Sequence, residues 1–201
     1  MKKKLLSLSL LSIFMITSNS SFAKEIKNDV KTKNINSSNS EIKIGSTVDG
    51  KFVNSFEPKP IIGLKYTFYS YSSNPNYPMP PKEETTEVVS INNDYATLRL
   101  SGSFREESDK LVKMSDIRSS GVVYVKFKYE GLTDVKVPFK NFKNATKVSV
   151  SNKTNDLTLW LIKDIGVVKL TEYDKLSKNT IITVLKDFRY GNKLNINNKI
   201  Y

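Results

Sequence analysis

Carboxylates and lysines are the side chains with which this sequence could do chemistry, because it contains neither histidine nor cysteine. Their absence excludes Cys–His and Ser–His catalysis, thiolate ligation and most zinc sites. Glu83, Glu84 and Glu87 form one acidic cluster and residues 106–109 hold a second, either of which could bind calcium or act as an acid/base pair. Neither has the spacing of a calcium loop, and solvated acidic turns are commoner. We therefore predict a non-enzyme with no catalytic residue, no metal site and no cofactor.

Aromatic side chains are the other group that could form a site. They crowd around "SSNPNYPMPPK", which has four prolines between Pro75 and Pro81 and is expected to be an exposed loop. One interpretation is a binding edge for an apolar or carbohydrate ligand. The other, which the sequence favours, is a half-buried strand with tyrosines at its rim, because β-rich domains use such residues structurally. The aromatic residues are Tyr66, Phe68, Tyr69, Tyr71 and Tyr77.

The first 23 residues have the three-part layout of a secretory signal peptide. Lys2–Lys4 form a positive head, Leu5–Ile16 is an uncharged and mainly apolar run, and Ser21 and Ala23 occupy the −3 and −1 positions of the expected cut. The apolar run is shorter than the roughly 20 residues that cross a bilayer. We predict a signal peptide at 1–23, cleavage after Ala23, a periplasmic or secreted protein, and no transmembrane span in the mature chain.

The chain is strongly basic. Its formal net charge is +12, and it becomes +9 when the three lysines of the signal are removed. A basic protein can meet nucleic acid, an anionic membrane or an anionic polymer. Only four of the 32 basic residues are arginine, the side chain on which nucleic-acid readers rely for planar bidentate contacts, and the lysines are scattered. We therefore predict a solvated basic surface and no nucleic-acid partner.

The rest of the chain divides into a polar leader and one domain. Residues 24–58 are rich in Lys, Asn and Ser, which predicts a flexible leader in which "EIKIG" is a candidate short strand. Residues 59–201 alternate between apolar and polar positions, most clearly in "GVVYVKFKYEG", and residues 105–120 fit either a helix or a strand. About nine strands are expected. The predicted fold is mainly β, a strongly curved antiparallel sheet, half-barrel or barrel-like, with at most one or two short helices.

The densest apolar segment contains the only tryptophan. The three leucines of "DLTLWLI" form one row, and Trp160 lies in the other row with Ile162. Asp164 and Gly166 then suit a turn into "GVVKLTEY". Because both rows are apolar, we expect cover on both faces of this strand and a largely buried Trp160.

Three segments, in this order, resemble a group of exported bacterial proteins of unknown function whose sheets are similar to the lipoprotein-carrier half-barrel. They are "IIGLKYTFYSY", "VPFKNFKNATKVSV" and "LTLWLIKDIGVVKLTEY". In that group the last motif has an aromatic residue, a Gly-Val-Gly-like turn and then Val-Lys. Here Asp164 stands where the first glycine is common, and Phe139 and Lys140 replace a small pair after the proline. The resemblance covers about residues 61–190, implies a curved sheet partly wrapped around an apolar interior, and transfers no catalytic residue.

Two functions follow as expectations. The first is an exported binding protein that holds an apolar ligand, an acyl chain or an exposed protein segment, in the curved sheet. The second is a structural or interaction protein of the cell envelope that contacts anionic polymers through a basic surface. In the first, the concave side and its rim form the site. The residues expected to line that site are Val123, Val125, Phe127, Trp160, Tyr69, Tyr71 and Tyr77.

Overall fold

The computed structural model describes residues 42–76, 79–114 and 125–191, which form one antiparallel sheet of ten strands in the order β1-β6-β7-β8-β9-β10-β2-β3-β4-β5. Strands β6 to β10 are neighbours in chain order, β10 then pairs with β2, and β2 to β5 continue in chain order. The strands are β1 (Thr47–Asp49), β2 (Lys65–Ser72), β3 (Lys82–Asn92), β4 (Tyr95–Gly102), β5 (Arg105–Lys113), β6 (Lys126–Lys136), β7 (Asn141–Ser151), β8 (Asn155–Ile162), β9 (Gly166–Asp174) and β10 (Asn179–Arg189).

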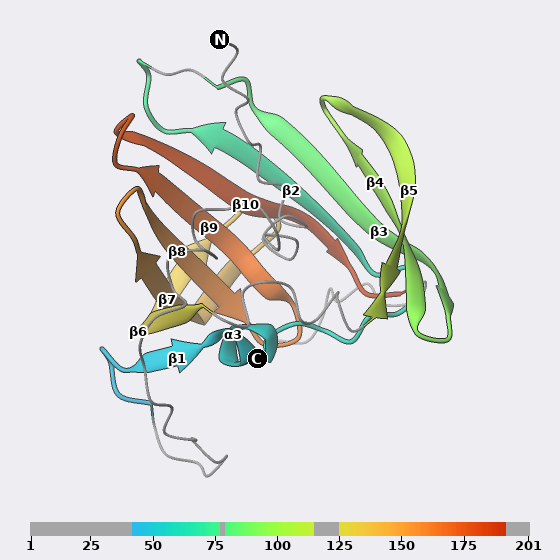
Figure 1. Cartoon of the computed structure of the whole chain (residues 1–201), viewed down its shortest axis with the longest axis horizontal. Coiled ribbons are helices and arrows are strands. Elements are labelled where there is room, and N and C mark those ends of the chain that lie inside the picture. The colour runs from blue at the N-terminus through green and yellow to red at the C-terminus, as the bar shows by residue number, and fades with distance from the viewer. Residues whose placement is uncertain (1–41, 77–78, 115–124, 192–201) are drawn as a thin grey trace.

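The sheet is strongly curved and remains open, with β1 and β5 as its edge strands (Figure 1). The predicted fold class is therefore confirmed. Part of the uncertain range 105–120 is now settled, because Arg105–Lys113 forms β5. Alternating residues produce this arrangement, since each strand can bury one row of side chains while its other row faces outward.

The two faces of the sheet differ in how deeply their side chains are buried. On one face Val148, Leu159, Leu170 and Thr183 stand side by side on β7 to β10, and none is more than 4% exposed. We call this the inner face. The neighbouring positions along the same strands point the other way and form the outer face. The inner face therefore carries the hydrophobic core, as a single curved sheet requires.

The turn between β8 and β9 confirms the expected turn around Asp164 and Gly166. Asp164 and Gly166 have positive φ angles of 61° and 90°, and the Ile165 amide donates to the Ile162 carbonyl at 3.1 Å. A Cβ at position 166 would lie 3.3 Å from Cγ of Glu57. Glycine suits Gly166 for both reasons, because L side chains are strained at such φ values and little room is left.

A bulge follows this turn and explains why β9 buries successive residues. Trp160 pairs with Lys169, but Leu161 pairs with Val167, so Val168 is an extra residue on β9. A bulge disturbs the strict alternation of side chains. Val167 and Val168 are accordingly both buried, at 5% and 0% exposure.

The predicted polar leader at 24–58 contains two elements of the fold. Strand β1 pairs with β6, and the helix α3 (Gly50–Asn54) follows it directly (Figure 1). Asp49 accepts a hydrogen bond from the Phe52 amide as the N-cap of this helix. Val48 and Val53 are buried. The first strand is thus Thr47–Asp49 and not the predicted "EIKIG", whose residues 42–45 have no strand structure. The predicted signal peptide lies outside the described residues.

Within the described ranges, no helix is both long and apolar enough to cross a membrane.

Candidate binding surface on the outer face

The residues predicted to form one site lie in different places. Phe127 is on the inner face and is 2% exposed. Its face follows from that of Tyr129, which lies two positions along β6 and pairs with the inner-face Val148. Trp160 is on the outer face, one residue beyond the inner-face Leu159, and it is only partly buried. The structure therefore does not bring Phe127 and Trp160 together in one concave site. Val125 is partly buried against the core. Val123 and Tyr77 lie outside the described residues.

Two lysines flank Trp160 on the outer face. Lys147 on β7 and Lys169 on β9 are its direct cross-strand neighbours, and their Nζ atoms lie 5.6 and 4.8 Å from the centre of its ring system. We call Lys147, Trp160 and Lys169 the cation row. Each cation–π contact contributes about 0.5–1 kcal/mol at an exposed position. The apolar strand therefore has cover on its second face from the two lysine side chains.

The cation row carries excess positive charge. Among the described residues, no carboxylate forms an ion pair with Lys147 or Lys169. The carboxylates nearby on this face already have cationic partners. These pairs are Glu83 with Lys186, Glu130 with Lys128 and Asp156 with Lys175. The pKa of the Glu130 carboxyl is lowered chiefly by hydrogen bonds from Ser149 and Lys128, which keeps it ionised and engaged.

The cation row continues toward the predicted tyrosines. Lys169 pairs with Val184 on β10, and Val184 pairs with Tyr69 on β2. Tyr71 lies two residues further along β2, with its ring centre 5.7 Å from that of Tyr69. Tyr69, Tyr71 and Trp160 thus share the outer face, as three members of the predicted set.

A second row runs beside the cation row. Ser149, Thr158 and Thr171 are cross-strand neighbours on β7, β8 and β9, each two positions along its strand from a member of the cation row. We call these three residues the hydroxyl row. It leads on to Ile182 on β10 and Tyr71 on β2. All of these side chains are partly exposed.

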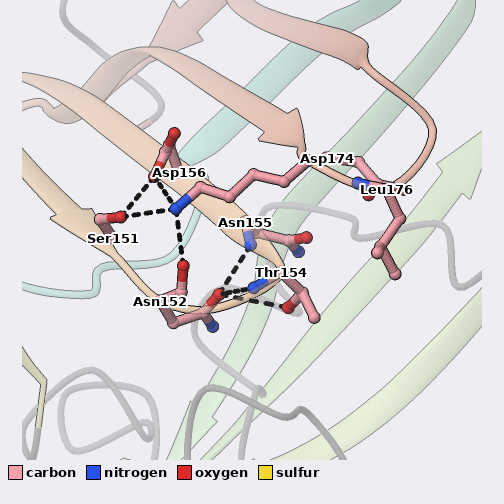
Figure 2. A network of polar contacts seen from close by, with 8 residues as sticks. Ser151, Asn152, Thr154, Asn155, Asp156, Asp174 and Leu176 are labelled. Atoms are coloured by element: carbon pink, nitrogen blue, oxygen red, sulfur yellow. Dashed lines mark hydrogen bonds and ion pairs between the residues drawn. The ribbon is translucent and has the colours of Figure 1, made fainter.

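The far end of the outer face is fixed by a polar network (Figure 2). The Lys175 ammonium donates to Asp156, Ser151 and the Asn152 carbonyl at 2.8, 2.8 and 2.7 Å. Asn152 also accepts from the Thr154 and Asn155 amides and so shapes the turn between β7 and β8. Hydrogen bonds from Lys175 and then Ser151 lower the pKa of the Asp156 carboxyl. The network ties this turn to the start of the β9–β10 turn.

The predicted acidic clusters are divided between the two faces or engaged in ion pairs. Glu83 and Glu87 pair with lysines on the outer face, whereas Glu84 lies on the inner face opposite Phe68. Burial raises the pKa of the Glu84 carboxyl, and Lys82 and Arg105 oppose this shift. Arg99 bridges Glu107 and Asp109 of the second cluster. No group of metal-binding side chains occurs among the described residues.

The Glu172 carboxyl on the inner face leads us to expect that the stability of the protein depends on pH. Burial and the charge of Asp174 raise the pKa of Glu172, although Asn155 donates a hydrogen bond to it at 2.9 Å. Because the folded state holds this proton more tightly than the unfolded state, stability falls as pH rises above the ordinary value of 4.5. Glu172→Gln is therefore expected to raise the free energy of unfolding at pH 7 by up to about 1 kcal/mol. Urea unfolding of the wild type and the variant at pH 4 and pH 7 measures this gain in stability. A gain at pH 7 that is no larger than the gain at pH 4 would contradict the prediction.

Comparison with known proteins gives structural likenesses only. No protein-family model and no curated protein matches the chain. Among solved structures, a candidate lipoprotein from Parabacteroides distasonis is 10% identical, with a TM-score of 0.42 over 67% of this chain and 98% of that one. The Pseudomonas aeruginosa MucA/MucB complex is 8% identical, with a TM-score of 0.46 over 71% of this chain and 57% of that one. A LolA superfamily protein from Nitrosomonas europaea is 9% identical, with a TM-score of 0.29 over 74% of this chain and 96% of that one. The solved structures that this chain resembles thus include a candidate lipoprotein and a LolA superfamily protein, each at 10% identity or less.

Sequence reasoning did not identify Lys147 and Lys169 as functional residues. Each alternates with buried neighbours, Thr146 and Val148 for the first and Val168 and Leu170 for the second, which marks both as outer-face positions. The two lysines meet at Trp160 because of the strand register, which the alternation of apolar and polar residues does not reveal.

Proposed function

We propose that the protein is an exported, non-enzymatic binding protein of the cell envelope that contacts anionic polymers through the outer face of its sheet. The observation that supports this proposal is the cation row, in which two lysines that form no ion pair within the described chain flank a partly exposed tryptophan. A polyanion can approach such a surface without first breaking ion pairs. The lack of histidine and cysteine supports a binding function rather than catalysis.

The outer face is favoured over the curved interior by the packing of the core. An apolar ligand held inside the sheet needs inner-face side chains that the protein leaves uncovered. Leu159 and Leu185 have no exposed surface, and Phe127 is 2% exposed. These residues are already in contact with the protein's own atoms, so we place binding on the opposite face.

The test is a titration of the chain beginning at Lys24 with polyglutamate and with oleate, followed by Trp160 fluorescence at low and high salt. Polyglutamate should change the emission, because any anion bound to Lys147 or Lys169 lies close to the indole ring. Its affinity should fall steeply as salt rises, since exposed charges are screened. A response to oleate that survives high salt, with none to polyglutamate, would support the apolar-ligand function and overturn this proposal.

A double variant, Lys147→Gln with Lys169→Gln, identifies the surface. Each lysine near an anionic surface contributes about 1 kcal/mol, so affinity for polyglutamate should fall at least about tenfold. The matched control is Lys59→Gln with Lys113→Gln, which removes the same charge from exposed positions before β2 and on β5. Equal losses in the two variants would show that net charge alone, and not the cation row, governs binding.

A further inference from the structure

We infer that the polymer is an acidic polysaccharide, with sugar rings that carry anionic groups, and that the hydroxyl row binds its sugar hydroxyls. This inference rests on the proposed function and adds the chemical class of the ligand. It comes from the order of the rows across the outer face, in which cations, hydroxyls and tyrosines adjoin one another.

The rows have a regular spacing. Neighbouring strands are about 4.8 Å apart, so Lys147 and Lys169, which stand two strands apart, have backbones separated by about 10 Å. The hydroxyl row lies about 7 Å away along the strands, because each of its members is two positions from a member of the cation row. A chain that crosses β7 to β9 therefore meets separated positive charges along one side and closely spaced hydroxyls along the other.

The hydroxyl row has capacity for ligand contacts. Thr158 and Thr171 are partly exposed, and their side chains make no hydrogen bond within the described chain. Ser149 donates to Glu130 at 2.7 Å and retains acceptor capacity. A hydroxyl both donates and accepts, as sugar hydroxyls do, so this row suits a polyol. A polyanion without hydroxyl groups would contact the lysines only, and the hydroxyl row would remain hydrated.

The tyrosines supply apolar contact on the same face. Across β10 from the two rows, on β2, the Tyr69 and Tyr71 rings lie 5.7 Å apart and are partly exposed. Tyrosine combines an apolar ring with a polar tip, which suits the mixed surface of a sugar ring. The Trp160 ring is already occupied by the two ammonium groups. Its part is to hold those charges, and Tyr69 and Tyr71 contact the sugar.

The experiment compares three polymers that separate charge from sugar. Polygalacturonate has sugar rings and carboxylates, polyglutamate has carboxylates alone, and dextran has sugar rings alone. We expect polygalacturonate to bind at least about tenfold more tightly than polyglutamate at equal charge concentration, because hydrogen bonds to the hydroxyl row add to the ionic contacts. Dextran should bind more weakly than either.

The double variant Thr158→Val with Thr171→Val tests the row itself. Valine keeps the β-branched shape and suits a strand, so the fold should be retained, as circular dichroism would show. The variant should lose about tenfold in affinity for polygalacturonate while its affinity for polyglutamate stays within about twofold. Thr97→Val, a partly exposed position on β4, is the matched control and should change neither.

The outcomes distinguish this inference from the function on which it rests. Equal affinity for polygalacturonate and polyglutamate, unaffected by the threonine variant, would overturn the inference and leave the proposed function standing. Binding of neither polymer would overturn both.

Discussion

Leu159→Ala is expected to lower the free energy of unfolding by about 3–5 kcal/mol, whereas Trp160→Ala, one residue further along β8, is expected to lower it by only about 1–2 kcal/mol. Leu159 has no exposed surface and stands between Val148 and Leu170 on the inner face. Its truncation leaves a cavity that tightly packed neighbours cannot fill. Trp160 is only partly buried where it packs against the core, and the two lysine stems that flank it are flexible and can collapse over the gap.

Urea unfolding followed by far-ultraviolet circular dichroism measures both variants, since one of them lacks the only tryptophan. Thr158→Ala, on the outer face and on the other side of Leu159, is the control and should cost less than about 1 kcal/mol. An equal cost for the leucine and tryptophan variants would place Trp160 in the core. The wild-type emission maximum should lie between those of a fully buried indole and of free indole in water.

The alternation of apolar and polar residues predicted the fold class because burial on one face acts on every long strand. "YATLRLSGSF" illustrates this, since Ala96, Leu98, Leu100 and Phe104 are expected on one side and the first three are buried. Phe104 is 68% exposed, because the chain turns between β4 and β5 at this position. The turn at Asp164 and Gly166 was also predictable, because positive φ angles favour these residue types. Local signals of this kind do not depend on how distant strands pair.

Strand β1 shows where local signals fail. Three residues are too few for an alternating pattern to stand out, and Thr47–Asp49 is a strand because it pairs with β6, nearly 80 positions along the chain. "EIKIG" has the better alternation, but its described residues form no strand and make only one backbone hydrogen bond to β6, from Gly45 to Tyr129. Long-range pairing, rather than propensity, thus decides where the first strand lies.

The composition of the candidate surface depends on register in the same way. Apolar residues on both faces of "DLTLWLI" predict cover on both faces of this strand and a largely buried Trp160. The cover over Trp160 comes from Lys147 and Lys169. Their aliphatic stems lie along the indole while their ammonium groups contact the face of the ring. The extra residue at Val168 shifts the pairing of β8 with β9, so counting residues back from the turn would not place Lys169 correctly opposite Trp160.

Tyr66 is expected to be a second position with a large effect on stability. It lies on β2, and its hydroxyl donates to the carbonyl of Ile165, 99 positions away in the β8–β9 turn, at 3.0 Å. Its ring centre is 5.1 Å from that of Phe188 and 6.0 Å from that of Phe68. Tyr66→Ala removes both the ring and the bond and should cost about 3 kcal/mol, a value near the lower end for aromatic truncation because Tyr66 is partly buried.

Tyr66→Phe separates the hydrogen bond from the ring. It keeps the aromatic contacts but leaves the Ile165 carbonyl without its donor, which should cost about 1–2 kcal/mol. Tyr173→Phe removes the hydroxyl of an exposed tyrosine on β9 and is the control, with an expected cost within about 0.5 kcal/mol. Urea unfolding at pH 8 measures all three variants. If Tyr66→Phe cost no more than Tyr173→Phe, the bond to the turn would have no net stabilising effect.

Alkaline pH gives an independent test of the same contact. Burial, and then the negative charges of Glu57 and Tyr190, raise the pKa of the Tyr66 phenol well above 10. The folded state therefore keeps this proton at pH values where the unfolded chain releases it, so stability must fall as pH rises above 10. Tyr66→Phe cannot ionise at this position and should lose less stability than the wild type between pH 9 and 11. As pH rises, the difference in stability between the two proteins should narrow, because ionisation progressively offsets what the hydroxyl contributes.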